Sequence, residues 1–137
     1  MTCRILYWLK QLLKGLVLSF SFFMVCGAGC SDFSEKVGNG YYYHRINSID
    51  QIIAPKRWND TTPIIPAKVV VYKITGRYVA AKREVIKEGK HVSEMLTGKY
   101  DFWILDTLKP EVFGPMDKRD FDIQISKLGL SPKLSLD

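Results

Sequence analysis

The chain has 137 residues, 47% of them hydrophobic and 25% charged, which is enough apolar material for one folded domain and excludes a disordered polymer. Its formal net charge is +6, but Arg4, Lys10 and Lys14 precede Cys30 with no acid among them, so the remainder carries 17 bases against 14 acids. This small surplus excludes the strongly basic composition that is typical of nucleic-acid-binding domains, and we predict no nucleic-acid partner.

The three cysteines, Cys3, Cys26 and Cys30, all lie in the first 30 residues. A domain that follows Cys30 therefore has no disulfide framework of its own. Its stability has to come from a hydrophobic core.

The first 29 residues have the pattern of an export signal. Residues 1–14 are basic with apolar residues between the charges, and residues 15–29 form an uncharged apolar run. The run is shorter than the ~18 to 20 residues that a membrane-spanning helix needs. Extending it back through Leu12 and Leu13 leaves an uncleaved membrane anchor as an alternative.

Three small residues, Gly27, Ala28 and Gly29, stand immediately before Cys30, and the segment resembles the lipobox of bacterial lipoproteins. The resemblance implies that the Cys30 thiol receives a diacylglyceryl group and that cleavage occurs just before it, so that residues 1–29 are a lipoprotein signal peptide. More than one acyl chain, of the palmitate type, would hold the protein stably at a membrane, since each buried methylene contributes roughly 0.8 kcal/mol. We therefore expect an exported protein that is lipid-anchored at Cys30 in the membrane of the bacterial cell envelope.

Gly27 departs from the lipobox pattern, which usually has leucine or another aliphatic residue three positions before the cysteine. The alternative is conventional cleavage after Ala28, with Cys26 and Ala28 at the two recognition positions, which would release a soluble protein. An unpaired cysteine near the start of such a protein would be a liability in an oxidising compartment, and this favours lipidation.

The exported part is predicted as a short tether over residues 30–39, which is polar and contains glycine, followed by a single globular domain over 40–137. Short β-rich runs bounded by turn residues outnumber helical patterns in that domain. The predicted strands cover 41–46, 51–53, 68–74, 77–82, 100–106 and 111–113. Turns at 75–76 and 107–110 join the last four strands into two hairpins, and three prolines predict a loop over 54–66.

One strand and one helix define the expected packing. Residues 102–105 are apolar on both strand faces, which is typical of a central strand covered on each side. A helix is predicted over 118–128, with Asp117 as its N-cap, Gly129 as its stop and an apolar stripe facing the sheet. We therefore predict an α+β fold, with a mainly antiparallel sheet and a C-terminal helix packed on one face.

Few residues of the domain carry a chemical signature. His44 and His91 have no carboxylate or nucleophile at a spacing typical of a metal or acid–base site, and no serine lies in a G-x-S-x-G elbow or an S-x-x-K pair. The densest basic run, 82–90, is predicted to be a solvated edge or helix face. We predict no catalytic residue, metal site or cofactor. The enzyme alternative would need a pocket that gathers His44 or His91 with Asp101, Asp106 or another acid.

Aromatic residues are the better candidates for recognition, because exposed tyrosine and tryptophan are good anchors for a protein or saccharide partner. On a strand, Tyr41 and Tyr43 share one face and Tyr42 takes the other. We name Tyr41, Tyr43 and Trp58 as the candidate binding surface. The alternative is that alternate aromatic residues fill the core, as they commonly do in strands.

Four short segments carry a family resemblance. They are Gly40–Tyr43, a tryptophan strand at 103–106, Val112–Pro115 and the helix end at 127–129. Together with a lipobox, these segments resemble the small, uncharacterised bacterial lipoproteins of the DUF3997 family. The resemblance implies the fold and the membrane address, and it brings no established activity. We therefore expect a non-catalytic binding module with a protein partner in the cell envelope; the alternative is an immunity-type protein that neutralises a toxin there.

Overall fold

The computed structural model describes residues 32–136, so the predicted signal peptide and Cys30 lie outside the described residues. The elements of the described chain are β1 (Phe33–Gly38), β2 (Tyr41–Arg45), β3 (Gln51–Pro55), β4 (Val69–Thr75), β5 (Tyr78–Ile86), α2 (Val92–Met95), β6 (Leu96–Asp106), β7 (Glu111–Met116), α3 (Lys118–Lys127) and the 3-10 helix η1 (Pro132–Leu134). Between residues 32 and 136, no helix has both the length and the apolar character needed to cross a membrane.

The strands form two antiparallel sheets, where the sequence predicted one. β1, β2 and β3 make a three-stranded sheet, and β4, β5, β6 and β7 make a four-stranded sheet, each in chain order. The chain changes sheet between β3 and β4, where Pro63 and Pro66 lack the N–H that strand pairing needs and a single bridge joins Ile65 to Ile53. The α+β class with mainly antiparallel pairing is confirmed.

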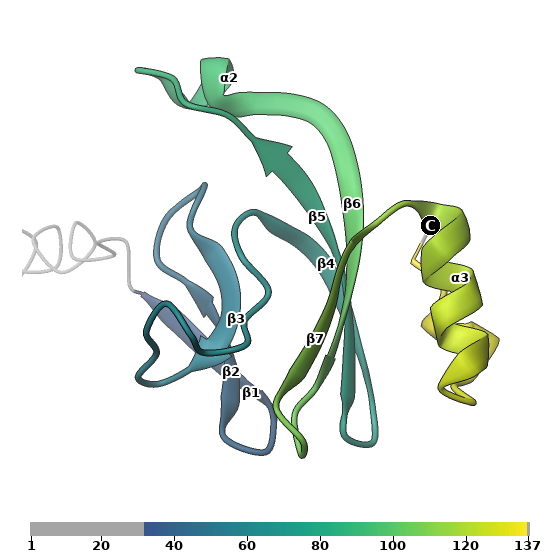
Figure 1. Ribbon diagram of the computed structural model, residues 1–137. Coiled ribbons are helices and arrows are strands. Elements are labelled where there is room, and N and C mark those ends of the chain that lie inside the picture. The colour runs from purple at the N-terminus through teal and green to yellow at the C-terminus, as the bar shows by residue number, and fades with distance from the viewer. Residues whose placement is uncertain (1–31, 137) are drawn as a thin grey trace, which may run out of the picture. The chain divides into compact units, whose positions relative to one another are not determined.

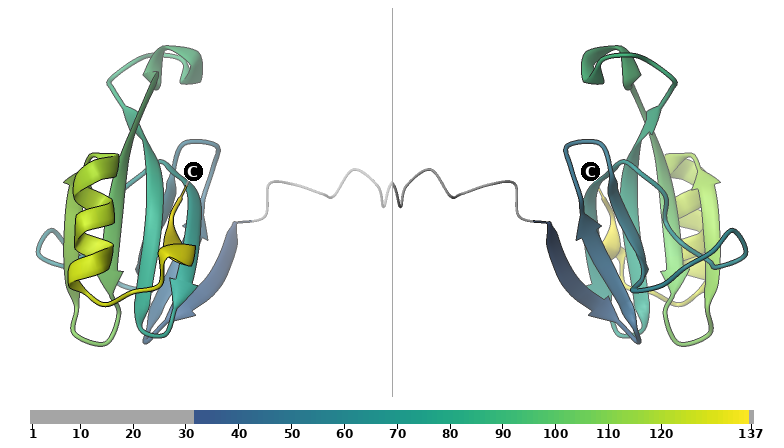
Figure 2. Two further views of the ribbon diagram at one scale, coloured as in Figure 1. Left: turned by 90° about the vertical axis from the view of Figure 1, so that its right-hand side faces the viewer. Right: turned by 90° about the vertical axis from the view of Figure 1, so that its left-hand side faces the viewer.

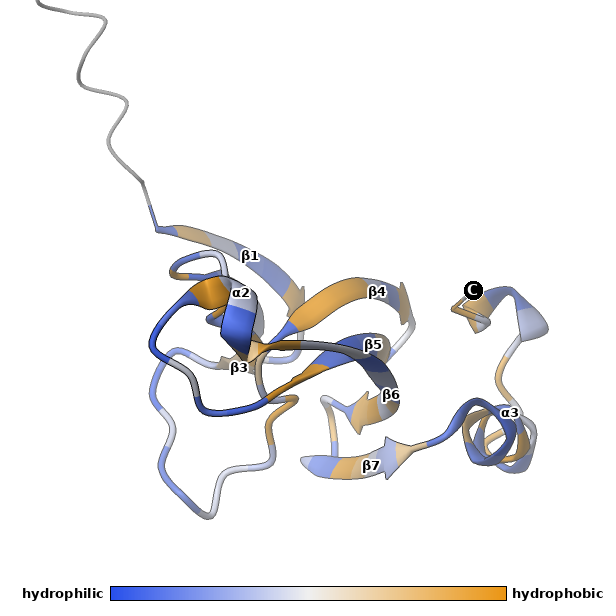
Figure 3. Ribbon diagram, turned by 90° about the horizontal axis from the view of Figure 1, so that it is seen from above, coloured by the Kyte–Doolittle hydropathy of each residue, from blue (hydrophilic) through white to orange (hydrophobic). Residues whose placement is uncertain are grey.

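The four-stranded sheet is the middle of three layers, between the three-stranded sheet and α3 (Figure 1). Strand β6 is covered on both faces in this arrangement. Its residues 102–105 are all buried, and their side chains alternate between the two faces of the sheet. The core between the sheets contains Val37, Tyr41, Ile53, Ile65, Val69, Val79, Ala81, Trp103 and Leu105. The core beneath α3 contains Ala80, Phe102, Ile104, Phe121, Ile125, Leu134 and Leu136. The prediction of a central strand covered on both sides is thus confirmed, and Figure 3 shows the same order of layers from above.

The C-terminal helix α3 lies against the face of the four-stranded sheet that is turned away from β1, β2 and β3 (Figure 2). Its start is fixed by the Asp117 side chain, which accepts a hydrogen bond from the backbone N–H of Asp120 at 2.8 Å. Phe121 and Ile125 are the buried residues of the helix, and Gly129 ends it with a φ of 65°. The helix, its cap and its stop are therefore as the sequence predicted.

Residues 33–38, which we expected to belong to a tether, instead form the edge strand β1. The strand pairs with β2 from Phe33 opposite Arg45 to Gly38 opposite Tyr41, through a turn in which Gly40 has a φ of 79°. The prediction failed because an edge strand whose side chains are mostly exposed is as polar as a linker.

Candidate functional site

The three residues predicted as a binding surface do not share one surface. Tyr41 is only 3% exposed, and its hydroxyl donates to the Pro63 carbonyl at 3.0 Å. Tyr43 is half-buried, with its ring centroid 4.9 Å from that of Tyr72 on β4. The prediction is wrong for these two tyrosines, because their face of β2 meets the four-stranded sheet. Trp58, in contrast, is 41% exposed.

The tyrosines between the two sheets, Tyr41, Tyr43 and Tyr72, have raised pKa values. Burial raises the pKa of Tyr41, and it raises that of Tyr43 despite the opposing charge of Arg45. Burial is also the main reason that the pKa of Tyr72 is strongly raised, and the bond that its hydroxyl donates to Glu35 at 2.7 Å adds to the effect. All three hydroxyls therefore hold their protons more tightly in the folded domain than in the unfolded chain.

Alkaline pH is accordingly expected to destabilise the domain. A raised pKa means that the folded state binds more protons than the unfolded state once the pH passes the ordinary tyrosine value of 10.0, so the free energy of unfolding falls as the pH rises further. Urea unfolding at pH values from neutral to above 10.0 measures the slope of the unfolding free energy against pH. Tyr72→Phe should flatten this slope, and an unchanged slope in that variant would contradict the assignment.

The outward face of β2 carries a second set of aromatic rings. Tyr42 and His44 lie there with ring centroids 6.0 Å apart, and Trp58, from the loop after β3, brings its ring to 5.4 Å from that of His44. Lys56 places its ammonium group 5.2 Å from the centroid of the Tyr42 ring, within cation–π range. We call Tyr42, His44, Lys56 and Trp58 the aromatic surface.

His44 is held in place by hydrogen bonds at both of its ring nitrogens. Nε2 lies 3.2 Å from the Ala54 carbonyl, and Nδ1 lies 2.9 Å from the Ser34 hydroxyl on β1. A carbonyl only accepts, so Nε2 carries the proton, and in the neutral ring Nδ1 then accepts from Ser34. These two hydrogen bonds therefore fix the orientation of the imidazole ring that Trp58 contacts.

The period of two along β2 placed Tyr42 on the face opposite Tyr41, and His44 follows by the same rule. That signal was enough to put both residues on one face. The position of Trp58 was not predictable, because it depends on how the loop over 56–66 folds back on the sheet.

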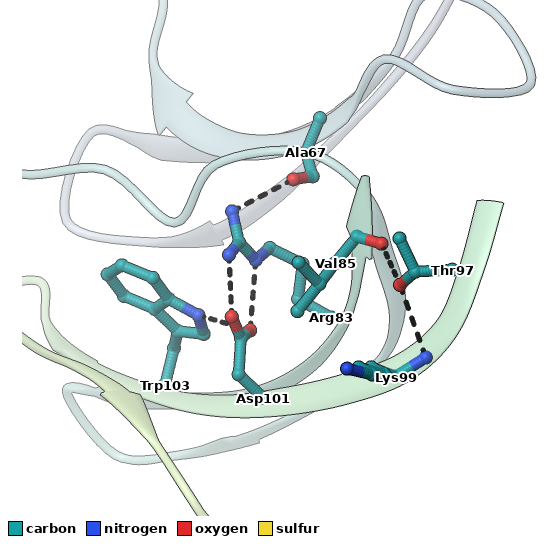
Figure 4. Close-up of polar contacts among 7 residues, drawn as sticks. All are labelled: Ala67, Arg83, Val85, Thr97, Lys99, Asp101 and Trp103. Carbon is teal, nitrogen blue, oxygen red and sulfur yellow. Dashed lines mark hydrogen bonds and ion pairs between the residues drawn. The ribbon is translucent and has the colours of Figure 1, made fainter. Parts of the chain in front are cut away.

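A buried ion pair between Arg83 and Asp101 joins β5 to β6 (Figure 4). The Asp101 carboxylate accepts from Arg83 Nε at 2.9 Å, from Arg83 Nη2 at 2.5 Å and from Trp103 Nε1 at 2.7 Å. Arg83 Nη1 also donates to the Ala67 carbonyl at 3.1 Å, just before β4. The prediction of a solvated face over 82–90 is therefore wrong for Arg83, because its cross-strand partner is a buried aspartate.

Asp106, the second aspartate of the enzyme alternative, is also paired with an arginine. Its Oδ2 lies 2.9 Å from Arg77 Nη2, and its Oδ1 accepts from two backbone N–H groups of the turn into β7. His91 is exposed at the N-cap of α2. Among residues 32–136, no group of three side chains that could bind a metal occurs.

Comparison with known proteins identifies the family of the domain. A sequence profile described as Protein of unknown function (DUF3997) matches residues 38–137. The chain belongs to the DUF3997 family. The match begins at the last residue of β1 and extends over the strands and helices that follow. Searches of the curated proteins and of the solved structures found no match.

Two of the residues by which the DUF3997 resemblance was recognised are in contact in the fold. Gly114 has a φ of 147°, and a Cβ atom at this position would lie 2.5 Å from Trp103 Cδ2. A side chain at 114 has no room beside the indole ring. The tryptophan strand and the Gly-Pro segment therefore form one packing unit.

Proposed function

We propose that this DUF3997 member is a membrane-anchored bacterial lipoprotein whose domain is a non-catalytic binding module in the cell envelope. The observation that carries the binding role is the aromatic surface, which combines a histidine ring held by hydrogen bonds with an exposed tryptophan ring. His44 is held by Ser34 and Ala54, while Trp58 is 41% exposed beside it. Tyrosine, histidine and tryptophan side chains have few rotatable bonds and lose little conformational entropy when a partner covers them, which favours recognition.

The anchor in this proposal is supported by the sequence before the domain. Cys30 follows three small residues and an uncharged run, and it precedes β1 by three positions. A lipid at Cys30 would confine the domain to the membrane surface, where the aromatic surface would meet its partner.

Photocrosslinking in cells that make the full-length chain tests the binding role. A photoreactive phenylalanine analogue replaces Trp58 in one strain and Ile123 in another, since Ile123 is similarly exposed, at 43%, but lies on α3. We expect a covalent adduct between position 58 and an envelope partner in the membrane fraction, and no adduct from position 123. Equal adduct formation from the two positions, or none from position 58, would contradict the proposal.

The immunity-type alternative differs from this proposal in its partner. The same strains separate the two when they are challenged with envelope-active toxins. If a toxin is crosslinked from position 58 and the native protein protects cells from that toxin, the immunity-type function would replace the proposed one.

A further inference from the structure

Strand β1, which contacts the aromatic surface through Ser34, begins three residues after the predicted lipid attachment. β1 begins at Phe33, so Cys30 is three residues away and at most about 11 Å from the start of the strand. The next residue of β1, Ser34, contacts His44 of the aromatic surface at 2.9 Å. A lipid on Cys30 would therefore hold this edge of the three-stranded sheet at the membrane, with no long linker between them.

The charges on this face are suited to an anionic partner. Lys36 of β1 is the cross-strand neighbour of Tyr42, so the two side chains lie on the same face, and Lys56 lies over the Tyr42 ring. Both lysines are exposed. Glu35, which stands beside Lys36 in the chain, faces the other way and accepts the hydrogen bond from Tyr72. Positive charge thus flanks Tyr42 on two sides.

We propose that the aromatic surface docks on the anionic lipid leaflet in which Cys30 is anchored. The inference rests on the proposed function and names the partner of the same surface. Tyrosine and tryptophan rings prefer the membrane–water interface, and lysines are attracted to anionic headgroups. Each contact is weak, but a short tether makes docking an intramolecular event with a high effective concentration of lipid.

Tryptophan quenching by brominated lipids tests the docking directly. The full-length gene product is purified from bacterial membranes, its lipid at Cys30 is verified by mass, and it is reconstituted into brominated phosphatidylcholine vesicles with or without phosphatidylglycerol. A protein cleaved before Cys30 keeps two of the three tryptophans, Trp58 and Trp103, so the difference between the native protein and Trp58→Phe isolates the signal of Trp58. We expect bromine quenching of Trp58 in the vesicles with phosphatidylglycerol, together with protection from iodide in the water.

Charge variants provide the matched comparison. Lys36→Gln and Lys56→Gln should each lower the equilibrium constant for docking about fivefold, as expected for one surface lysine at an anionic membrane. Arg119→Gln and Lys127→Gln, both exposed on α3, should leave it unchanged.

Two results would overturn the docking alone. One is a lipidated protein whose Trp58 stays open to iodide and is not quenched by bromine, which would leave the surface to a protein or saccharide. The other is equal bromine quenching with and without phosphatidylglycerol. A Cys30 without lipid would overturn the proposed anchor and the docking together, and the mass measurement identifies this case before any vesicle is made.

Discussion

Asp101→Asn is expected to lower the free energy of unfolding by about 3–5 kcal/mol, the usual cost of breaking a buried ion pair by removing one partner. The carboxylate accepts from Arg83 through two guanidinium nitrogens and from the Trp103 indole. Asparagine has nearly the same shape, so the variant leaves the packing intact. It leaves the Arg83 charge unpaired, with its side chain only 16% exposed.

Urea unfolding, followed by the fluorescence of Trp103 and Trp58, measures this loss. Asp122→Asn is the matched control, because Asp122 pairs with Lys118 on the exposed side of α3 with its own side chain 54% exposed. An exposed pair of this kind contributes about 0.3–0.5 kcal/mol. Equal losses in the two variants would show that the Asp101 pair is not buried in solution.

Phe121→Ala is the second substitution with a large expected effect, again about 3–5 kcal/mol of unfolding free energy. Phe121 lies on α3 with its side chain fully buried against the four-stranded sheet, and its ring centroid lies 5.2 Å from that of Phe102 on β6. Removing the ring deletes the central contact between the helix and the four-stranded sheet. The cavity that remains adds to the loss of buried apolar surface.

Ile123→Ala on the same helix separates this packing effect from helix propensity. Ile123 is 43% exposed, so its replacement is expected to change the unfolding free energy by no more than about 0.5 kcal/mol. Thermal and urea unfolding of both variants give the comparison. A Phe121→Ala variant as stable as Ile123→Ala would mean that α3 does not pack on the sheet.

The strands of the two hairpins, β4 with β5 and β6 with β7, and the helix α3 were predictable because their signals are local. The apolar run at 102–105 identified a strand covered on both faces, and Asp117 and Gly129 marked the limits of the helix. β1 was not predicted because most of its side chains are exposed, although Asn39–Gly40 is a local hairpin signal. The division into two sheets depends on contacts between distant segments, which no local pattern records.

The candidate site was predictable only in part. Periodicity separated Tyr42 from Tyr41 and Tyr43 but could not say which face of β2 would meet the other sheet. Trp58 was named as a candidate for a binding surface and is 41% exposed, while its contact with His44 depends on a proline-bearing loop with no regular pattern. The arginine partners of Asp101 and Asp106 are 18 and 29 positions away along the chain, and strand register is what brings them together.

The proposed membrane anchor of the domain depends on Cys30, and metabolic labelling tests this proposal most directly. The native chain and Cys30→Ala are grown with a palmitate analogue, the cells are fractionated, and the mass of the N-terminus is measured. We expect label, membrane retention and a mature protein that begins at a lipid-modified Cys30, all of which are lost in the variant. An unlabelled soluble protein that begins at Gly29, or an unlabelled full-length protein in the membrane, would contradict the lipid anchor.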